Sequence, residues 1–381
     1  MEPIYLDNGT LKRPSDHLLN QMVPFLKRHW PSITAPYLKG KEPFTSIERS
    51  LCDLRAFVGA GDLDAFHFCS SGSQAAAEVF QSFAFDHVTQ TGKNHFLTSK
   101  IESAPILLQK ERLEKIGIYA QDIPLNEQGQ VTPEALREAI TPKTGLIALS
   151  WANPLTGVIH PIWDLAECAK EHDILFYVDA SAALGSLYFK FEELPLDFLS
   201  FDGPLLHGPK GSGGLFVRRG VDFSPSAPVG MEGADLNLAA LVGLGIAVEE
   251  MSASFDHLSL ETARLTDKLE QGIALALPEI KILFKEAERL PTTTAIVFPG
   301  ASAELLAFHL REQGVHASFG GGNEQKLEPL LTSSGIDPFD AKCALSFSLS
   351  RMTTEEEIDR AIAVIVDCAQ RCQTFSRELA L

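Results

Sequence analysis

Acidic and hydroxyl residues follow several short apolar runs of this chain. Asp179 ends the run 174–179, Asp202 follows the run 198–201, and Cys69-Ser70-Ser71-Gly72-Ser73-Gln74 links a third run to a helical pattern. The free amides of a first helical turn bind phosphate groups, so this link predicts one half of an anion site. The alternative is a simple strand-to-helix turn capped by serine, and Asp179 could equally accept hydrogen bonds from backbone amides.

The segment after Phe201 carries the most specific pattern. It reads Asp202-Gly203-Pro204-Leu205-Leu206-His207-Gly208-Pro209-Lys210-Gly211. Together with Val178-Asp179-Ala180-Ser181 it resembles the centre of the class V aminotransferase and cysteine desulfurase family, whose members carry pyridoxal phosphate. In that family a His-Lys pair precedes the Gly-Pro-Lys-Gly turn, and its lysine forms the Schiff base and acts as a general base. Pro204-Leu205 stands at that pair here, and leucine can do neither.

The elements that must position these residues alternate between apolar runs and amphipathic stretches from about residue 62 to 218. This alternation predicts a mainly parallel sheet covered by helices. The predicted strands span 64–69, 95–99, 116–120, 145–151, 174–179, 198–201 and 214–217. Helices are predicted over 73–87, 133–140 and 161–172, the last with proline at its first turn.

Beyond Gly233 the pattern changes to a long helical stretch over 236–276, interrupted near Leu258. Thr354 and Glu357 have the spacing of a capping box at the start of the last helix, and a loop spans about 318–328. Strands are predicted at 280–284, 293–298 and 345–350, and a helix at 303–313.

This order of elements resembles fold type I of the pyridoxal-phosphate enzymes. Tyr5-Leu6-Asp7-Asn8 is similar to the opening strand motif of the family, and the stretch 348–359 is similar in outline to its C-terminal motif. The resemblance implies an α/β large domain with a mainly parallel seven-stranded sheet and a smaller C-terminal α+β domain. We expect residues 16–250 to form the large domain and 251–381 the small one, which residues 1–15 join.

The resemblance also implies which residues would hold the cofactor. Ser73 and Gln74 begin the helix of the phosphate cup, Asp179 stands where the family acid pairs with the pyridinium nitrogen, and Asn153 matches an asparagine near the ring. The residue that contacts the ring oxygen is represented by Ala182 and Ala183. The histidine that stacks on the ring is represented by Ser103.

Two acids stand where the family places hydroxyl groups around the phosphate. Asp202 replaces the hydroxyl residue before the lysine, and Gly233-Ala234-Asp235 replaces a Gly-Thr pair from the partner subunit. Two like charges about 4 Å apart cost about 4 kcal/mol at an effective dielectric constant of 20. If both carboxylates faced the cup, phosphate binding would be abolished. The alternative is that Asp235 caps the next helix and Asp202 makes a local turn.

Arg351 matches the arginine that grips the α-carboxylate of the substrate, a role that suits the guanidinium fork. The alternative is an ordinary ion pair in an acidic protein. A desulfurase also needs a nucleophilic cysteine on a mobile loop. The corresponding loop, 318–326, contains none, so desulfuration by the family mechanism is not expected.

Composition argues against several other classes of protein. The chain has 381 residues, 45% of them apolar, and a formal net charge of −18, so it can bury a large core but does not suit nucleic acid or an anionic membrane. No signal peptide or membrane span is expected, which predicts a cytoplasmic protein. The six cysteines lack metal-ligand spacing, so we predict free thiols and no metal site.

We therefore hypothesise a catalytically degenerate relative of cysteine desulfurase in which pyridoxal phosphate is absent or bound non-covalently. It would serve as a homodimer that binds another protein or an unidentified small molecule, or that regulates a partner. The alternative is an active class V enzyme in which Lys210, another lysine or a non-covalent cofactor replaces the missing anchor. A third possibility is unrelated chemistry in the old pocket, with Asp179, Asp202, His207 and Asp235 as its polar residues.

Overall fold

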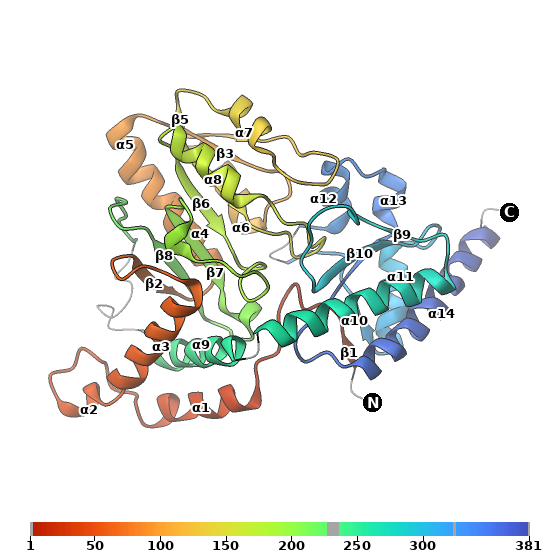
Figure 1. Cartoon of the computed structure of the whole chain (residues 1–381), viewed down its shortest axis with the longest axis horizontal. Helices are drawn as coiled ribbons and strands as arrows, with labels where there is room; N and C mark the ends of the chain where they lie inside the picture. The colour runs from red at the N-terminus through yellow and green to blue at the C-terminus, as the bar shows by residue number, and fades with distance from the viewer. Residues whose placement is uncertain (1–2, 227–235, 254, 323–324, 380–381) are drawn as a thin grey trace.

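A seven-stranded sheet forms the centre of the larger part of the chain (Figure 1). The computed structural model describes residues 3–226, 236–253, 255–322 and 325–379. The strands lie in the order β2-β8-β7-β6-β5-β3-β4; β8 is antiparallel to both of its neighbours, and the other pairs are parallel. Their bounds are β2 Ala65–Cys69, β3 His95–Thr98, β4 Tyr119–Asp122, β5 Thr144–Ser150, β6 Leu175–Asp179, β7 Phe198–Asp202 and β8 Gly213–Val217.

Helices cover both faces of this sheet, because its central strands are apolar on both sides. Ile147 and Phe176 point to one face and pack against α3 (Phe44–Val58), α8 (Ile162–Glu171) and α9 (Leu238–Ser252). Leu146 and Tyr177 point to the other face and pack against α4 (Gly72–Ser82) and α6 (Ala104–Glu114). The remaining helices here are α1 Asp16–Lys27, α2 Leu38–Lys41, α5 Val88–Thr91 and α7 Pro133–Ala139, with a π-helical turn at Phe83–His87 and 3-10 turns at Phe191–Glu193 and Gly203–Leu206.

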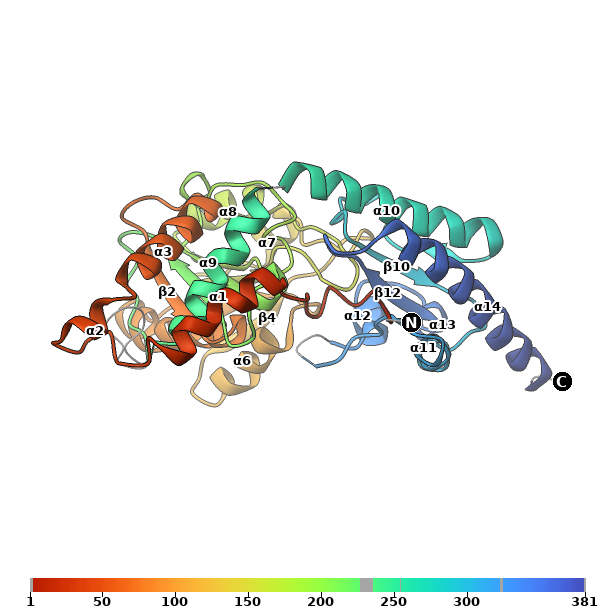
Figure 2. The same ribbon diagram turned by 90° about the horizontal axis from the view of Figure 1, so that it is seen from below.

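A C-terminal unit is built on the antiparallel sheet β12-β10-β9. Its long helices α10 and α14 lie side by side (Figure 2), and a Cβ at Gly272 would come within 2.6 Å of Ile362. Strand β1 pairs in parallel with β11, so the start of the chain joins this unit. Its elements are β1 Ile4–Tyr5, α10 Phe255–Ala276, β9 Lys281–Ile282, β10 Thr293–Val297, α11 Ala303–Glu312, β11 Val315–His316, α12 Leu327–Ser333, α13 Pro338–Lys342, β12 Ala344–Ser348 and α14 Glu355–Leu379.

Most predicted strands match the structure, and three elements need correction. The strand predicted at 116–120 is displaced to Tyr119–Asp122, because Gly117 takes a φ of 80° in the turn after α6. The strand predicted at 280–284 is only Lys281–Ile282, and the helical break predicted near Leu258 lies between Ser252 and Phe255. The division at residues 15 and 250 stays a prediction. No helix in the described ranges is long and apolar enough to cross a bilayer.

The capping box predicted before α14 is present. The backbone N–H of Thr354 donates to the Glu357 carboxylate at 2.9 Å, and the N–H of Glu357 donates to Thr354 Oγ1 at 3.3 Å.

We expect Thr354→Ala to lower the free energy of unfolding by about 1 kcal/mol, because one amide of the first turn loses its acceptor. Thr374→Ala, on an exposed position of the same helix, should change it by less than about 0.5 kcal/mol in the same urea titration. Equal losses in the two variants would contradict the assignment.

Candidate functional site

The carboxylate of Asp202 lies at the first turn of helix α4. Its Oδ1 accepts a hydrogen bond from the backbone N–H of Gly72 at 2.9 Å. β2 runs parallel to β7 across the intervening β8, so the start of α4 and the end of β7 meet at one edge of the sheet. A Cβ at residue 72 would lie only 3.2 Å from the Asp202 Cβ, so glycine permits this approach. Asp202 was expected either to face the anion cup or to make a local turn. In the structure its carboxylate faces the first turn of α4.

A serine joins Asp202 to Asp179. Ser181 donates to Asp179 Oδ1 from its hydroxyl at 2.5 Å and from its backbone N–H at 3.0 Å. The same hydroxyl accepts from the backbone N–H of Asp202 at 3.0 Å. Sequence reasoning missed this role of Ser181, although its place two residues after Asp179 is the spacing of an Asx-type turn.

Three carboxyl groups interact at this edge of the sheet. Burial raises the pKa of Asp179, and burial followed by the neighbouring Asp179 raises the pKa of Asp202. Glu102 was not predicted as a site residue, yet it is buried and burial raises its pKa to about 7, with Asp179 adding to the rise. Glu102 is held by the Ser99 hydroxyl at 2.6 Å and the Ser150 N–H at 2.7 Å.

The other predicted cofactor residues serve the chain itself. Ser71 rather than Ser73 caps α4, with its Oγ accepting from the Gln74 N–H at 3.2 Å, so the serine-capped turn that was the alternative is present. Gln74 Oε1 accepts from the N–H and the hydroxyl of Ser70, both at 2.8 Å. Asn153 is buried; its amide donates to Ile101, and its oxygen accepts from two backbone amides of its own loop. The buried Oγ of Ser103 has no hydrogen-bond partner in the described part of the chain.

Leu205 and Lys210 differ sharply in environment. Leu205 is 7% exposed within the 3-10 turn Gly203–Leu206, whereas Lys210 is exposed in the following turn. His207 is buried with a φ of 62°, and its Nδ1 lies 2.7 Å from the carbonyl oxygen of Arg13. Burial, followed by nearby Lys12, lowers the pKa of His207 to about 3, so its ring stays neutral.

Arg351 forms an ion pair with Glu250 of α9, with 2.5 Å between Nη2 and Oε2. It also lines a small cavity together with Lys12 and His207. Lys12 was not predicted as a site residue. Its backbone N–H donates to the Pro204 carbonyl at 3.1 Å, which places it beside the turn that contains Leu205.

Asp235 lies outside the described residues, and no group of three or more metal-ligating side chains comes together within them.

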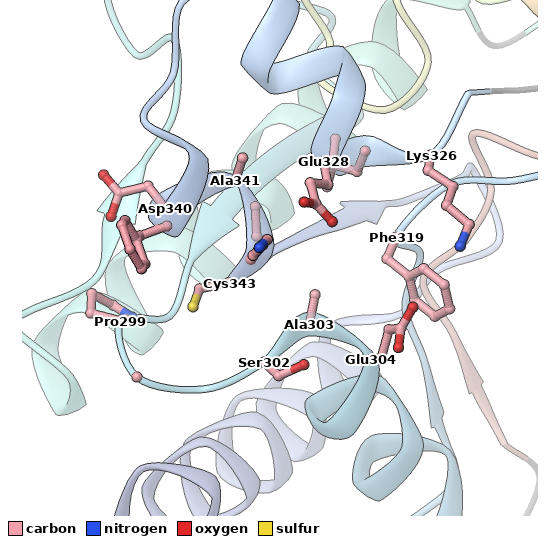
Figure 3. Close-up of a pocket in the computed structure, with 15 residues that line it drawn as sticks. Pro299, Ser302, Ala303, Glu304, Phe319, Lys326, Glu328, Asp340, Ala341 and Cys343 are labelled. Atoms are coloured by element: carbon pink, nitrogen blue, oxygen red, sulfur yellow. The ribbon is translucent and has the colours of Figure 1, made fainter. Parts of the chain in front are cut away.

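The loop without a cysteine borders a cavity that contains one. This cavity of about 630 Å³ is lined by Phe319, Lys326 and Glu328 on one side and by Cys343 on the other, and Figure 3 shows the Cys343 sulfur directed into it. Burial raises the pKa of the Cys343 thiol, whereas the Gly300 and Ala301 amides act in the opposite direction. Cys343 is therefore a protonated thiol at neutral pH and does not resemble an activated desulfurase nucleophile.

Comparison with known proteins agrees with this architecture. The sequence model of the family described as "Aminotransferase class-V" matches residues 4–361. The chain belongs to the class V aminotransferase family. It is 31% identical to a cysteine desulfurase of Cereibacter sphaeroides over 390 residues, covering 99% of each chain, and 30% identical to one of Bradyrhizobium diazoefficiens over 384 residues, covering 98% of this chain and 96% of the other. A solved structure titled "NIFS-LIKE PROTEIN" superposes with a TM-score of 0.88 at 24% identity, covering 97% of this chain and 100% of the other, which confirms fold type I.

The described residues do not fit the pyridoxal phosphate that the class V family implies. Leu205 offers no amine at the expected position. The Gly72 N–H, which would face a phosphate, already donates to Asp202. An ionised carboxylate at this edge would repel a dianionic phosphate by about 4 kcal/mol for each unit charge about 4 Å away, at an effective dielectric constant of 20. The conserved shape of the class V fold therefore surrounds a site with altered charge.

The acidic cluster predicts how stability depends on pH. A carboxyl whose pKa is raised by folding stabilises the protein below its unfolded pKa and loses that contribution as the pH rises through the folded value. For Glu102 the rise is from 4.5 to about 7, which at about 1.4 kcal/mol for each pKa unit is about 3 kcal/mol. The natural protein should therefore lose about 3 kcal/mol of its free energy of unfolding between pH 4.5 and pH 8 through Glu102 alone. Glu102→Gln has no such carboxyl, so its loss over the same range, measured by urea unfolding, should be smaller by about 3 kcal/mol.

An exposed glutamate of α6, Glu111, provides the control. Glu111→Gln should follow the natural protein across the same pH range, because Glu111 is exposed and lies outside the cluster. If Glu102→Gln lost as much stability as the natural protein over this pH range, a raised pKa of Glu102 in the folded protein would be the wrong description.

Proposed function

We propose that this class V relative does not hold pyridoxal phosphate covalently and is not an active desulfurase. In this proposal it is a non-catalytic homodimer that uses the retained scaffold to bind a partner protein or a small ligand. The observation that carries the proposal is the hydrogen bond between the Asp202 carboxylate and the Gly72 N–H. The Asp202 side chain there occupies the amide that the phosphate of the cofactor would need.

Two further features support the loss of the family chemistry. Leu205 cannot form a Schiff base, and the loop 318–326 has no cysteine to accept sulfur as a persulfide. The half-buried Cys343 beside that loop has a raised thiol pKa, so it does not supply the missing nucleophile. Together with Asp202, they affect three separate parts of the family mechanism: phosphate binding, Schiff-base formation and sulfur transfer.

The homodimer rests on the family resemblance and on exposed apolar side chains near the start of the chain. Leu26 is 66% exposed, Trp30 71% and Leu38 86%, in and around α1 and α2. Large apolar side chains left exposed within a short stretch of chain are consistent with a protein–protein contact. The cytoplasm is the proposed compartment, which the six free cysteines support, because disulfides are rare there.

The alternative enzyme that anchors the cofactor through Lys210 gains no support from the position of that residue. Lys210 is exposed in the turn after His207, whereas Asp179 lies at the end of β6. A cofactor held without a covalent bond would still meet the Asp202 carboxylate. We therefore keep the degenerate class V protein as the proposal.

Absorption spectroscopy with added pyridoxal phosphate tests it. The purified protein should show no aldimine band, and borohydride should fix no cofactor to a lysine. Leu205→Lys alone should bind the cofactor poorly, because Asp202 still repels the phosphate. The double variant Leu205→Lys with Asp202→Ser should bind the cofactor at least about tenfold more tightly than Leu205→Lys alone. Relief of about 1.4 kcal/mol of repulsion is enough for a tenfold change in affinity.

Asp202→Ser alone is the matched control, because it frees the Gly72 amide without adding an amine. It should show no aldimine band. A stable aldimine in the natural protein, mapped to any lysine after borohydride, would overturn the proposal.

A further inference from the structure

We propose that the cavity of about 630 Å³ beside Cys343 is a binding site for a small uncharged aromatic molecule. The inference goes beyond the proposed function, because every residue that lines this cavity lies between Pro299 and Ala344, in the C-terminal unit. Asp202 and Leu205, on which the proposed function depends, take no part in it. The two claims therefore stand or fall separately.

Several elements of the C-terminal unit meet around the cavity. Its lining comes from the starts of α11 and α12, from α13, from the first residue of β12 and from Phe319 and Lys326 of the loop between β11 and α12. Pockets that bind small molecules have volumes of about 300–1,000 Å³. The cavity therefore has room for a molecule of one or two rings.

The buried part of the lining is apolar. The lining residues that are at most 7% exposed are Ala303, Leu327, Ala341 and Ala344. Such a surface is stabilised by contact with an apolar body. A charged group among these side chains would lose its hydration without gaining a buried counter-charge, which is costly. The ligand should therefore present an uncharged apolar body to the interior.

Charges of both signs lie around this interior and balance one another. Asp340 forms an ion pair with Lys281, with 2.6 Å between Nζ and Oδ2. The other charged lining residues are exposed, two of them acidic and two basic: Glu304, Glu328, Lys326 and Lys342. Complementary charge is what selects an ionic ligand, and this lining has no net charge to offer. The balance favours a ligand without net charge.

Aromatic and sulfur groups face the cavity. Figure 3 shows the Phe319 ring on one side and the Cys343 sulfur on the other. Phe339, which also lines the cavity, is 82% exposed and gains most from being covered. Aromatic rings pack favourably on phenylalanine rings, and a sulfur atom about 5 Å from a ring adds a favourable contact. These groups favour an aromatic ligand over an aliphatic one.

Three indoles of similar shape test the class of ligand. At neutral pH indole is uncharged, indole-3-acetate is an anion and tryptamine is a cation. In calorimetric titrations of the full-length protein we expect indole to bind with a Kd below about 1 mM, and each charged indole to bind at least about threefold more weakly. Absence of indole binding, or a charged indole that binds as tightly as indole, would overturn the proposal.

Two thiols of the same chain report where indole binds. Cys343 is half-buried at the cavity, whereas Cys52 is exposed on α3. Saturating indole should slow alkylation of Cys343 by N-ethylmaleimide at least about fivefold, as measured by peptide mass spectrometry, and leave the rate at Cys52 within about twofold. An unchanged rate at Cys343 would place indole elsewhere and overturn the proposal.

A matched pair of phenylalanine variants tests the lining. Phe339→Ala removes a ring of the cavity, and Phe308→Ala removes a ring of α11 that is 48% exposed and does not line it. We expect Phe339→Ala to weaken indole binding at least about threefold and Phe308→Ala to change it by less than about 1.5-fold. Equal affinities of Phe339→Ala and the natural protein would contradict the assignment.

A third variant reduces the space itself. Ala303→Leu adds side-chain atoms to a buried position of the lining and should weaken indole binding at least about tenfold. Thermal denaturation shows whether this variant is folded. If it is not, Phe339→Ala still decides, because its exposed side chain can be removed without opening the core.

Pyridoxal phosphate distinguishes this inference from the proposed function. If the natural protein forms an aldimine while indole still protects Cys343, the proposed function fails and this inference stands. If no aldimine forms and indole does not protect Cys343, this inference fails and the proposed function stands.

Discussion

The hydrogen bond from the Gly72 N–H to the Asp202 carboxylate is the interaction on which the account depends. The first amides of a helix have no partner within the helix, so a site at the carboxyl edge of a sheet must satisfy them with a ligand, a side chain or water. Here β7 supplies the acceptor from its own last residue, at 2.9 Å. Ser181 then ties the same residue to Asp179, so the ends of β6 and β7 and the start of α4 form one connected network.

This network changes the charge of a scaffold whose shape is retained. The class V fold brings a helix N-terminus and several strand ends together, an arrangement suited to an anionic cofactor. In this chain the same edge holds Asp179, Asp202 and Glu102, and burial raises the pKa of all three. Positive charge lies instead at the neighbouring cavity, with Lys12 and Arg351. The family alone therefore does not define the binding chemistry of this site, which has to be argued from its residues.

Much of the fold could be predicted from the sequence because buried parallel strands are nearly continuous apolar runs. The run that became β6 ends at Asp179 as predicted, whereas Gly117 displaced β4 and the helical break moved away from Leu258. The site was less accessible, since the direction of a side chain depends on its neighbours in space. Whether Asp202 faced the helix or made a local turn was decided by the close approach that Gly72 allows. Lys12 carries no motif of its own, and Glu102 precedes Ser103 in a family-like stretch without having been given a role. Only their burial beside other charged groups sets them apart.

A crystal structure of the protein grown with pyridoxal phosphate would test the central claim most directly. The account predicts that the Asp202 carboxylate still accepts the Gly72 N–H and that no phosphate group lies at the first turn of α4. A phosphate bound to that turn, with Asp202 rotated away and the ring seated against Asp179, would contradict it.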